Sequence, residues 1–234
     1  MPPLRLLLSP AKELDFAAAH PAIATSAPRH LSTAREIVAH MAPLSPSAIS
    51  AALPCSLPLA SAASLAYKSF TTSPPSPALF AFAGVAFKSL DARSLPPPAV
   101  AWCARSLLVF CPVHGLLQAG DEMREYRMEL GHKLPLGGGE SMPLAKHWRA
   151  VLSADLAEDV PGGVLLDASS QEYGRSLLDL PLLNAAGVSV ATVAFRQGGR
   201  ACGSVHAKQS RGLFARWCAE NGVGSVGDAE GFDG

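Results

Sequence analysis

A lysine close to the start of the chain is the first residue whose position suggests chemistry. Lys12 follows the apolar run 4–8 and the dipeptide Ser9-Pro10. Because α/β folds place ligand-contacting groups beyond the ends of their strands, a lysine at this point could bind an anion. A solvated lysine in a proline turn, paired with Glu13 or Asp15, explains the same residues equally well.

Two further cations lie near the end of the chain. Lys208 and Arg211 precede a helix that the sequence predicts over Gly212–Asn221, closed by Gly222 in the left-handed conformation. Free N–H groups at a helix start bind phosphate, and two cations beside them favour such a site. The same cations oppose the helix dipole, which argues against a purely structural role.

Two polar runs supply candidate carboxylates. Residues 124–129 place two arginines and two glutamates around Tyr126. On a helix the glutamates would share one face and the arginines another, although a solvated helix face explains this run without any ligand. The run 169–173 follows a strand predicted over 164–166, so its polar groups, Glu172 among them, are expected at the edge of the sheet.

Three motifs have a plainer explanation than a site. Gly222 to Gly227 matches GxGxxG, but a helix precedes it and the chain nearly ends after it, so a dinucleotide site is rejected. Cys111 and His114 could form a nucleophilic pair, although a buried cysteine beside a turn histidine is favoured. The histidines at positions 20, 30 and 40 fit no metal-ligand spacing, and we expect neither a metal nor a cofactor.

Charge and composition narrow the class of protein. The 234 residues carry 19 basic and 19 acidic side chains, so any binding of nucleic acid must come from local clustering. Five cysteines without CxxC spacing argue against a disulfide framework and a zinc site. No apolar run approaches the roughly 20 residues of a transmembrane helix. We therefore expect a cytosolic monomer with no membrane partner.

Strands and helices alternate, which predicts one mixed α/β (α+β) domain over residues 1–234. A hairpin turn at Gly198-Gly199 makes the β core partly antiparallel, with helices flanking it and a poorly ordered tail from about residue 222. The predicted strands are 4–8, 78–87, 107–110, 164–166, 188–195 and 201–205, and the predicted loops are 71–77, 96–98 and 137–139. The predicted helices are 32–41 capped by Ser32, one from Ser45, one at 99–104, one capped by Ser141 with an apolar stripe from Leu144 to Leu156, and 212–221.

Taken in order, short motifs over nearly the whole chain resemble the peroxide stress protein YaaA family. The opening Leu-Ser-Pro-Ala-Lys, the Tyr-Arg-x-Glu-x-Gly run and the Lys-x-x-Arg-Gly element are specific when they occur together. The residues that carry the resemblance are Leu8 to Lys12, Leu14, Asp15, Ala81, Phe82, Gly84, Gly115, Leu117, Asp121, Tyr126 to Gly131, Trp148, Ser170, Glu172, Tyr173, Lys208, Arg211, Gly212 and Asn221.

The resemblance implies a β core flanked by helices, a positively charged cleft and a helix-hairpin-helix-like element. It also implies a role in the response to hydrogen peroxide and binding of duplex DNA, with no established catalytic activity. The family's cleft cations carry over only onto residues that match in type and position. With their polar neighbours, the expected cleft for DNA or another ligand comprises Ser9, Lys12, Tyr126, Arg127, Glu129, Glu172, Lys208 and Arg211.

Several positions depart from the family pattern. The C-terminal strand that members carry beyond the Gly-Phe at 231–232 is expected to be absent. The replaced residues are Ala83 and Val85 for a lysine and an aspartate around Gly84, His114 for a tyrosine, Gln118-Ala119 for Arg-Pro, Gln171 for an aspartate and Gln209 for a lysine.

Three functions are compatible with these residues. The first is a nucleic-acid-binding stress protein whose basic cleft gives a salt-dependent affinity. The second is a degenerate homologue that keeps the fold without the activity. The third is an enzyme for a small anionic metabolite, in which the cleft cations clamp the anion and Glu129 or Glu172 acts as the acid or base.

Overall fold

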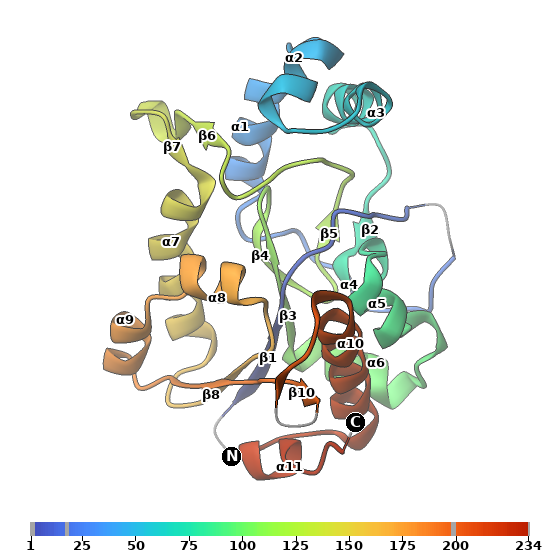
Figure 1. Cartoon of the computed structure of the whole chain (residues 1–234), viewed down its shortest axis with the longest axis vertical. Coiled ribbons are helices and arrows are strands. Elements are labelled where there is room, and N and C mark those ends of the chain that lie inside the picture. The colour runs from blue at the N-terminus through green and yellow to red at the C-terminus, as the bar shows by residue number, and fades with distance from the viewer. Residues whose placement is uncertain (1–2, 17–18, 198–199, 234) are drawn as a thin grey trace.

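The main β-sheet is built around the first strand of the chain. The computed structural model describes residues 3–16, 19–197 and 200–233. Its main sheet consists of β1 (Leu4–Leu8), β3 (Leu107–Cys111), β4 (Gly115–Gln118), β8 (Val164–Asp167) and β9 (Ser189–Thr192). Within the described residues the strand order is β4-β3-β1-β8-β9, with β4 antiparallel at one edge and the other strands parallel (Figure 1).

Helices cover both faces of this sheet. The helices of the described residues are α1 (Leu31–Met41), α2 (Pro46–Ala52), α3 (Leu57–Lys68), α4 (Ala78–Ala81), α5 (Val85–Leu90), α6 (Pro97–Ser106), α7 (Leu144–Asp159), α8 (Gln171–Leu177), α9 (Leu180–Ala185), α10 (Ser204–Asn221) and α11 (Val226–Ala229). Figure 1 shows α7, α8 and α9 on one side of the sheet, and α5, α6 and α10 on the other. Between them Leu6, Leu7 and Leu8 are at most 1% exposed, as expected for a parallel strand covered on both faces.

Short antiparallel pairs and turns complete the fold. The pairs are β2 (Ser76–Pro77) with β5 (Glu122–Met123), β6 (Lys133–Leu134) with β7 (Met142–Pro143), and β10 (Arg196–Gln197) with β11 (Arg200–Ala201). The 3₁₀ turns are η1 (Ala92–Ser94) and η2 (Leu136–Gly138). The predicted mixed α/β fold is therefore confirmed. The predicted hairpin turn at Gly198-Gly199 lies outside the described residues.

The strand predicted over 78–87 is wrong. The segment forms α4 and α5, and Phe82 between them makes a single bridge to Leu14. All four residues of α4 are at most 1% exposed. A helix buried on every side gives the same continuous apolar run as a buried strand, so periodicity cannot separate the two.

Residues 124–129 form neither a helix nor a strand, so the helix on which the glutamates would share one face and the arginines another is not present. Contacts from distant elements hold this backbone: the Tyr67 hydroxyl donates to the carbonyl oxygen of Arg127, and Arg124 Nε donates to the carbonyl oxygen of Ser73 at 3.1 Å. Tertiary contacts thus override the local charge pattern, as they commonly override helix propensity.

Helix ends differ from prediction where no side chain caps them. α1 begins after His30 and α7 after Pro143, so Ser32 and Ser141 are not the caps. The helix predicted from Ser45 is confirmed as α2, and Ser45 caps it, since its Oγ accepts the backbone N–H of Ala48 at 3.2 Å.

The final helix is longer than predicted. α10 begins at Ser204 and not at Gly212, so the strand predicted over 201–205 ends at Ala201. Gly222 closes α10 at φ 62°, as the sequence predicts. Beyond it α11 forms, and the ring of Phe232 packs on Phe214 with centroids 5.3 Å apart.

No single helix in the described ranges is long and apolar enough to cross a bilayer. The pair α2 and α3 has the necessary length and hydropathy only when the two helices are counted together, and they are bent by 107° relative to each other.

All five cysteines carry free thiols.

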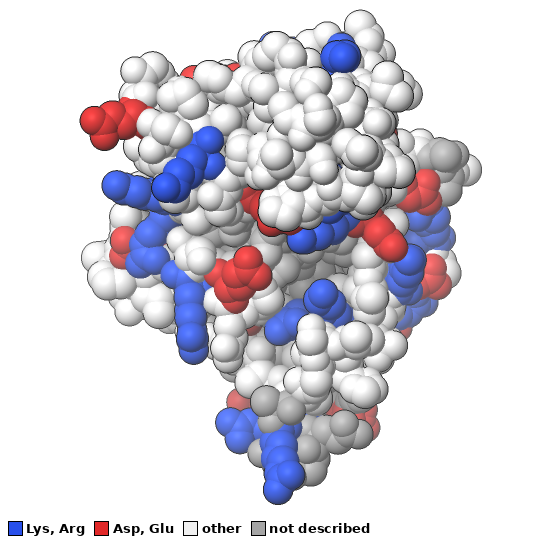
Figure 2. All heavy atoms as spheres, turned by 45° about the horizontal axis from the view of Figure 1, so that its top comes forward, with Lys and Arg blue, Asp and Glu red and all other residues white. Residues whose placement is uncertain are grey.

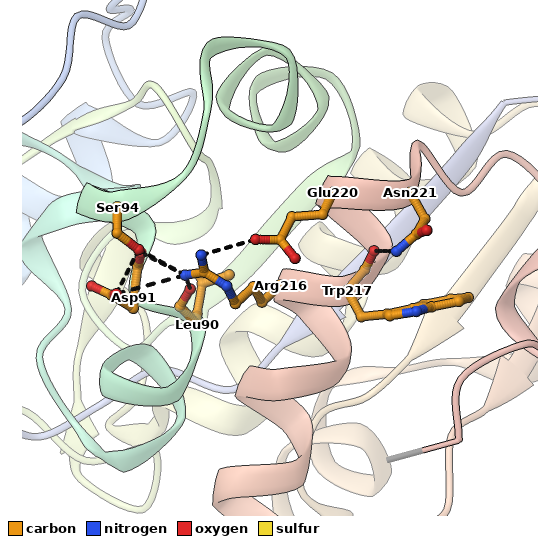
Figure 3. A network of polar contacts seen from close by, with 7 residues as sticks. All are labelled: Leu90, Asp91, Ser94, Arg216, Trp217, Glu220 and Asn221. Carbon is orange, nitrogen blue, oxygen red and sulfur yellow. Dashed lines mark hydrogen bonds and ion pairs between the residues drawn. The ribbon is translucent and has the colours of Figure 1, made fainter.

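One arginine fixes α10 against α5 and η1. Nη1 of Arg216 donates to the carbonyl oxygens of Leu90 and Asp91, at 3.1 Å each, and to Ser94 Oγ at 2.9 Å (Figure 3). Nη2 pairs with Glu220 at 2.8 Å. Asp91, at φ 45°, ends α5 in the left-handed conformation. Because α10 is one continuous helix, these contacts of Arg216 also fix the position of its first half.

Gly212 lets the backbone of α10 pack directly against α5. A Cβ at this position would lie 1.9 Å from the carbonyl oxygen of Ala86 and 2.7 Å from Ser89 Cβ. The glycine of the Lys-x-x-Arg-Gly element is therefore a packing requirement, and it places Arg211 beside α5.

We predict that Gly212→Ala destabilises the fold by about 1–3 kcal/mol, because the added methyl group overpacks α10 against α5. Urea unfolding measures the change in the free energy of unfolding. Gly131→Ala is the matched control: a Cβ there meets nothing within 4 Å, and the change should stay below about 0.5 kcal/mol. Equal effects from the two substitutions would contradict the close approach.

Candidate functional site

A large cavity lies beyond the carboxyl ends of the parallel strands. Its volume is about 1600 Å³, and Ser9 after β1, Asp167 at the end of β8 and Thr192 at the end of β9 all line it. Because β3 and β8 pair with opposite edges of β1, the strand order reverses here. Open α/β sheets bind ligands in the crevice at such a switch point. We call this cavity the pocket.

The pocket collects residues that are far apart in the sequence. The segment after β1, the loop after β5, the first turn of α8 and the first half of α10 each contribute side chains. All the residues predicted for the cleft line it, namely Ser9, Lys12, Tyr126, Arg127, Glu129, Glu172, Lys208 and Arg211. What they bind stays a prediction.

The pocket is more positive than the chain as a whole. Its described lining carries eight basic and four acidic side chains, whereas the full sequence has equal numbers of each. Figure 2 shows a hollowed face with basic side chains on both lips and acidic side chains between them. Local clustering therefore produces a field that net charge does not reveal.

Lys12 pairs across the pocket and not with its neighbours in sequence. Its Nζ lies 2.7 Å from Glu129 Oε1. Glu13 pairs instead with Lys88 at 2.7 Å, and Asp15 with Arg93 at 3.3 Å. The turn-lysine alternative, with Glu13 or Asp15 as partner, is therefore wrong. Because the Lys12 side chain is 71% exposed, this ion pair adds little stability and could open for a ligand.

Two arginines in the pocket have unengaged side chains. Nε of Arg127 and Nε of Arg211 are buried without a hydrogen-bond partner among the described residues. Burial lowers the pKa of the Arg211 guanidinium, and the nearby Asp167 carboxylate opposes that shift. Buried donors without acceptors are costly, so these guanidinium groups keep hydrogen-bonding capacity that the described residues do not use.

Lys208 and Arg211 do not flank a helix start. They lie inside α10, whose first residue is Ser204, so the backbone N–H groups around them are already hydrogen-bonded within the helix. The predicted phosphate site at a helix N-terminus is wrong. The side chains alone supply whatever attraction for anions exists here.

A hydrogen bond between two serines connects the segment after β1 with the segment after β8. The backbone N–H of Ser170 donates to Ser9 Oγ at 2.7 Å. Ser170 also caps α8, and Asp167 Oδ1 accepts the N–H of Ser169 at 2.9 Å. A Cβ on Gly174 would lie 2.7 Å from Asp167 Oδ2, so this glycine makes room for the carboxylate. The polar run after β8 lies at the sheet edge, as predicted.

Tyr126 faces a buried cluster beneath the pocket. Its hydroxyl is hydrogen-bonded to the sulfur of Cys111, which lies 3.4 Å from His114 Nδ1. Burial raises the pKa of Cys111 to about 11 and lowers the pKa of His114 to about 3. A protonated thiol and a neutral imidazole are no nucleophilic pair, so the favoured interpretation of a buried cysteine is confirmed.

The prediction missed several charged residues of the pocket. Asp167 follows the apolar run 164–166 directly, so the same end-of-strand argument that selected Glu172 could have found it. Arg149, Arg175 and Arg196 reach the pocket from α7, α8 and β10, and no local signal marks them.

The fold and the pocket define a mixed α/β protein with a pocket rich in basic side chains at the switch point of its sheet. A family model described as peroxide stress protein YaaA matches residues 4–234. The chain therefore belongs to the YaaA family.

Similar curated proteins carry the name UPF0246 protein. The chain is 30% identical to one from Rhizorhabdus wittichii and 31% identical to one from Chromobacterium violaceum. A third, from Aliivibrio fischeri, is 29% identical. Each alignment covers 97% of this chain and 90% of the relative.

We predict that buried His114 makes the fold sensitive to acid. An unfolded histidine takes up a proton near pH 6.5, whereas folded His114 does so only near pH 3. Between these values the unfolded chain binds more protons, so the free energy of unfolding falls as pH falls, by up to about 1.4 kcal/mol per pH unit. Urea unfolding at several pH values measures this slope.

His114→Gln should flatten the slope between about pH 6 and pH 4, since the substituted side chain does not titrate. His206→Gln, at an exposed position of α10, controls for the loss of a histidine. An undiminished slope in His114→Gln would show that His114 is not the group responsible.

Proposed function

We propose that this YaaA-family protein acts in the response to hydrogen peroxide by binding DNA through the pocket. The observation that carries the proposal is the local excess of basic side chains in one cleft of a chain with no net charge. Neutralised phosphates release counterions, so such a cleft gives affinity for nucleic acid without any base-specific contact.

The rim of the pocket supports contact with a DNA backbone. Arg175, Arg196 and Lys208 are exposed and form no ion pair with the described part of the chain. Lys12 and Lys88 are paired but 71% and 65% exposed, and exposed pairs are weak enough to exchange a carboxylate for a phosphate. The rim therefore offers cations from several elements to one polyanion.

The family and the thiols support the cellular setting of the proposal. The matched family is described by its role in peroxide stress. The proposal places the protein in the cytosol, where free thiols such as those of this chain stay reduced.

We predict that a short DNA duplex binds with an affinity that falls steeply between about 50 and 200 mM salt. The double substitution Lys12→Ala with Lys208→Ala should weaken binding, and it should reduce the slope of log affinity against log salt by about 0.9 for each phosphate that is no longer neutralised. Fluorescence anisotropy of a labelled duplex measures both quantities.

Lys133→Ala, which removes an exposed lysine outside the pocket, is the matched control and should leave affinity and slope unchanged. In a strain lacking its own family member, Lys133→Ala should restore growth in hydrogen peroxide and the double variant should not. Absence of binding at low salt, or equal behaviour of the control and the double variant, would sink the proposal.

A further inference from the structure

We infer that the floor of the pocket binds one nucleoside monophosphate unit, with its phosphate held between Arg127 and Arg211. The inference deepens the proposed function and rests on it, because both use the same pocket. In the proposed function the rim cations contact a polyanion at the surface. Arg127 and Arg211 are partly buried, so they would contact a group that enters the cavity.

The guanidinium groups of Arg127 and Arg211 are free to take a phosphate. Neither forms an ion pair or a side-chain hydrogen bond within the described residues, and Nε of each is buried. A guanidinium is a planar fork that binds phosphate oxygens through two parallel N–H···O bonds. Two forks from separate elements, the segment after β5 and α10, can hold one tetrahedral phosphate from two directions.

Carboxylates in the same cavity select against a ligand that is only an anion. Asp167 is close enough to Arg211 to oppose its loss of a proton, and Glu172 forms no ion pair within the described chain. A bare anion offers these oxygens no donor and their charge weakens its attraction to the arginines, so it should bind there less tightly than a nucleotide. A nucleotide brings a phosphate together with hydroxyl and amino donors, so it satisfies both sets of groups.

Apolar walls and an aromatic ring suit the planar base. Tyr173 lines the pocket and is held by stacking on Phe110, with centroids 6.4 Å apart. Aromatic side chains bind bases of any sequence through their faces. Further apolar lining residues are Leu178, Leu180, Pro181, Val190, Val193 and Phe195.

The size of the pocket favours an unpaired nucleotide within a strand. Small-molecule pockets usually enclose about 300–1,000 Å³, and this one is larger at about 1600 Å³, which leaves room for flanking nucleotides. A base paired inside a duplex cannot reach the bottom of a cavity unless it leaves the stack. A free nucleotide has the same chemistry, so experiment must separate the two sources.

Isothermal titration calorimetry of the full chain tests the inference with deoxyadenosine monophosphate, deoxyadenosine, inorganic phosphate, a single-stranded oligonucleotide and the matching duplex. We expect the monophosphate to bind at least tenfold more tightly than deoxyadenosine or phosphate. Arg127→Gln and Arg211→Gln should each weaken it at least tenfold. Arg211→Lys keeps the charge without the fork and should also weaken it. Arg105→Gln, exposed and outside the pocket, should not.

Thermal unfolding of each variant separates lost binding from lost folding, and Arg211→Lys provides a second test if Arg211→Gln does not fold. Tighter binding of the single strand than of the free monophosphate assigns the site to a strand, and the reverse order assigns it to free nucleotides. The inference is overturned if phosphate binds as tightly as the monophosphate, or if the monophosphate does not bind. Salt-dependent duplex binding in that case would leave the proposed function standing, whereas no binding of any probe removes both.

Discussion

The pairing of β1 with β3 along one edge and β8 along the other is the constraint on which the pocket depends. Leu7 lies opposite Asp167, the last residue of β8, so β1 and β8 end within one residue of each other. The chain leaving β1 then meets the chain leaving β8, where the N–H of Ser170 donates to Ser9 Oγ at 2.7 Å. Helices must cover both faces of a parallel sheet, and α8 and α10 become the walls of the crevice that remains above its carboxyl edge.

The charged groups at the rim of this crevice and those deeper in it differ in how strongly water and neighbouring charges affect them. At the rim, Lys12 is exposed and Glu129 is partly exposed, and water weakens their attraction, so exchange of the carboxylate for a ligand oxygen costs little. Deeper in the pocket, burial acts against the charge of Arg211, and Asp167 compensates for it only in part. An incoming anion would complete that compensation. The carboxylates limit which anions can do so, which explains how a basic pocket can still discriminate among ligands.

Sequence patterns predict the centre of this molecule better than its periphery. The strands predicted over 4–8, 107–110 and 164–166 are confirmed as β1, β3 and β8, the last two of which are one residue longer than predicted. The helices at 78–90 were not predictable because complete burial removes the periodicity that distinguishes a helix from a strand. The sequence predicts Gly212 as the first residue of the last helix. It lies inside α10, where the close approach of Ala86 leaves no room for a side chain. The family motifs found pocket residues both beyond strand ends, such as Lys12, and inside α10, such as Arg211. They missed arginines such as Arg149, whose position depends on helix packing alone.

A crystal structure of the full chain soaked with tungstate, a tetrahedral oxyanion with a strong anomalous signal, tests most directly whether these distant cations form one anion-binding pocket. The arrangement of the pocket predicts that the strongest anomalous peak lies within hydrogen-bonding distance of both Arg127 and Arg211, near Asp167. Peaks confined to other surfaces, or guanidinium groups of Arg127 and Arg211 that point to separate faces of the molecule, would contradict it.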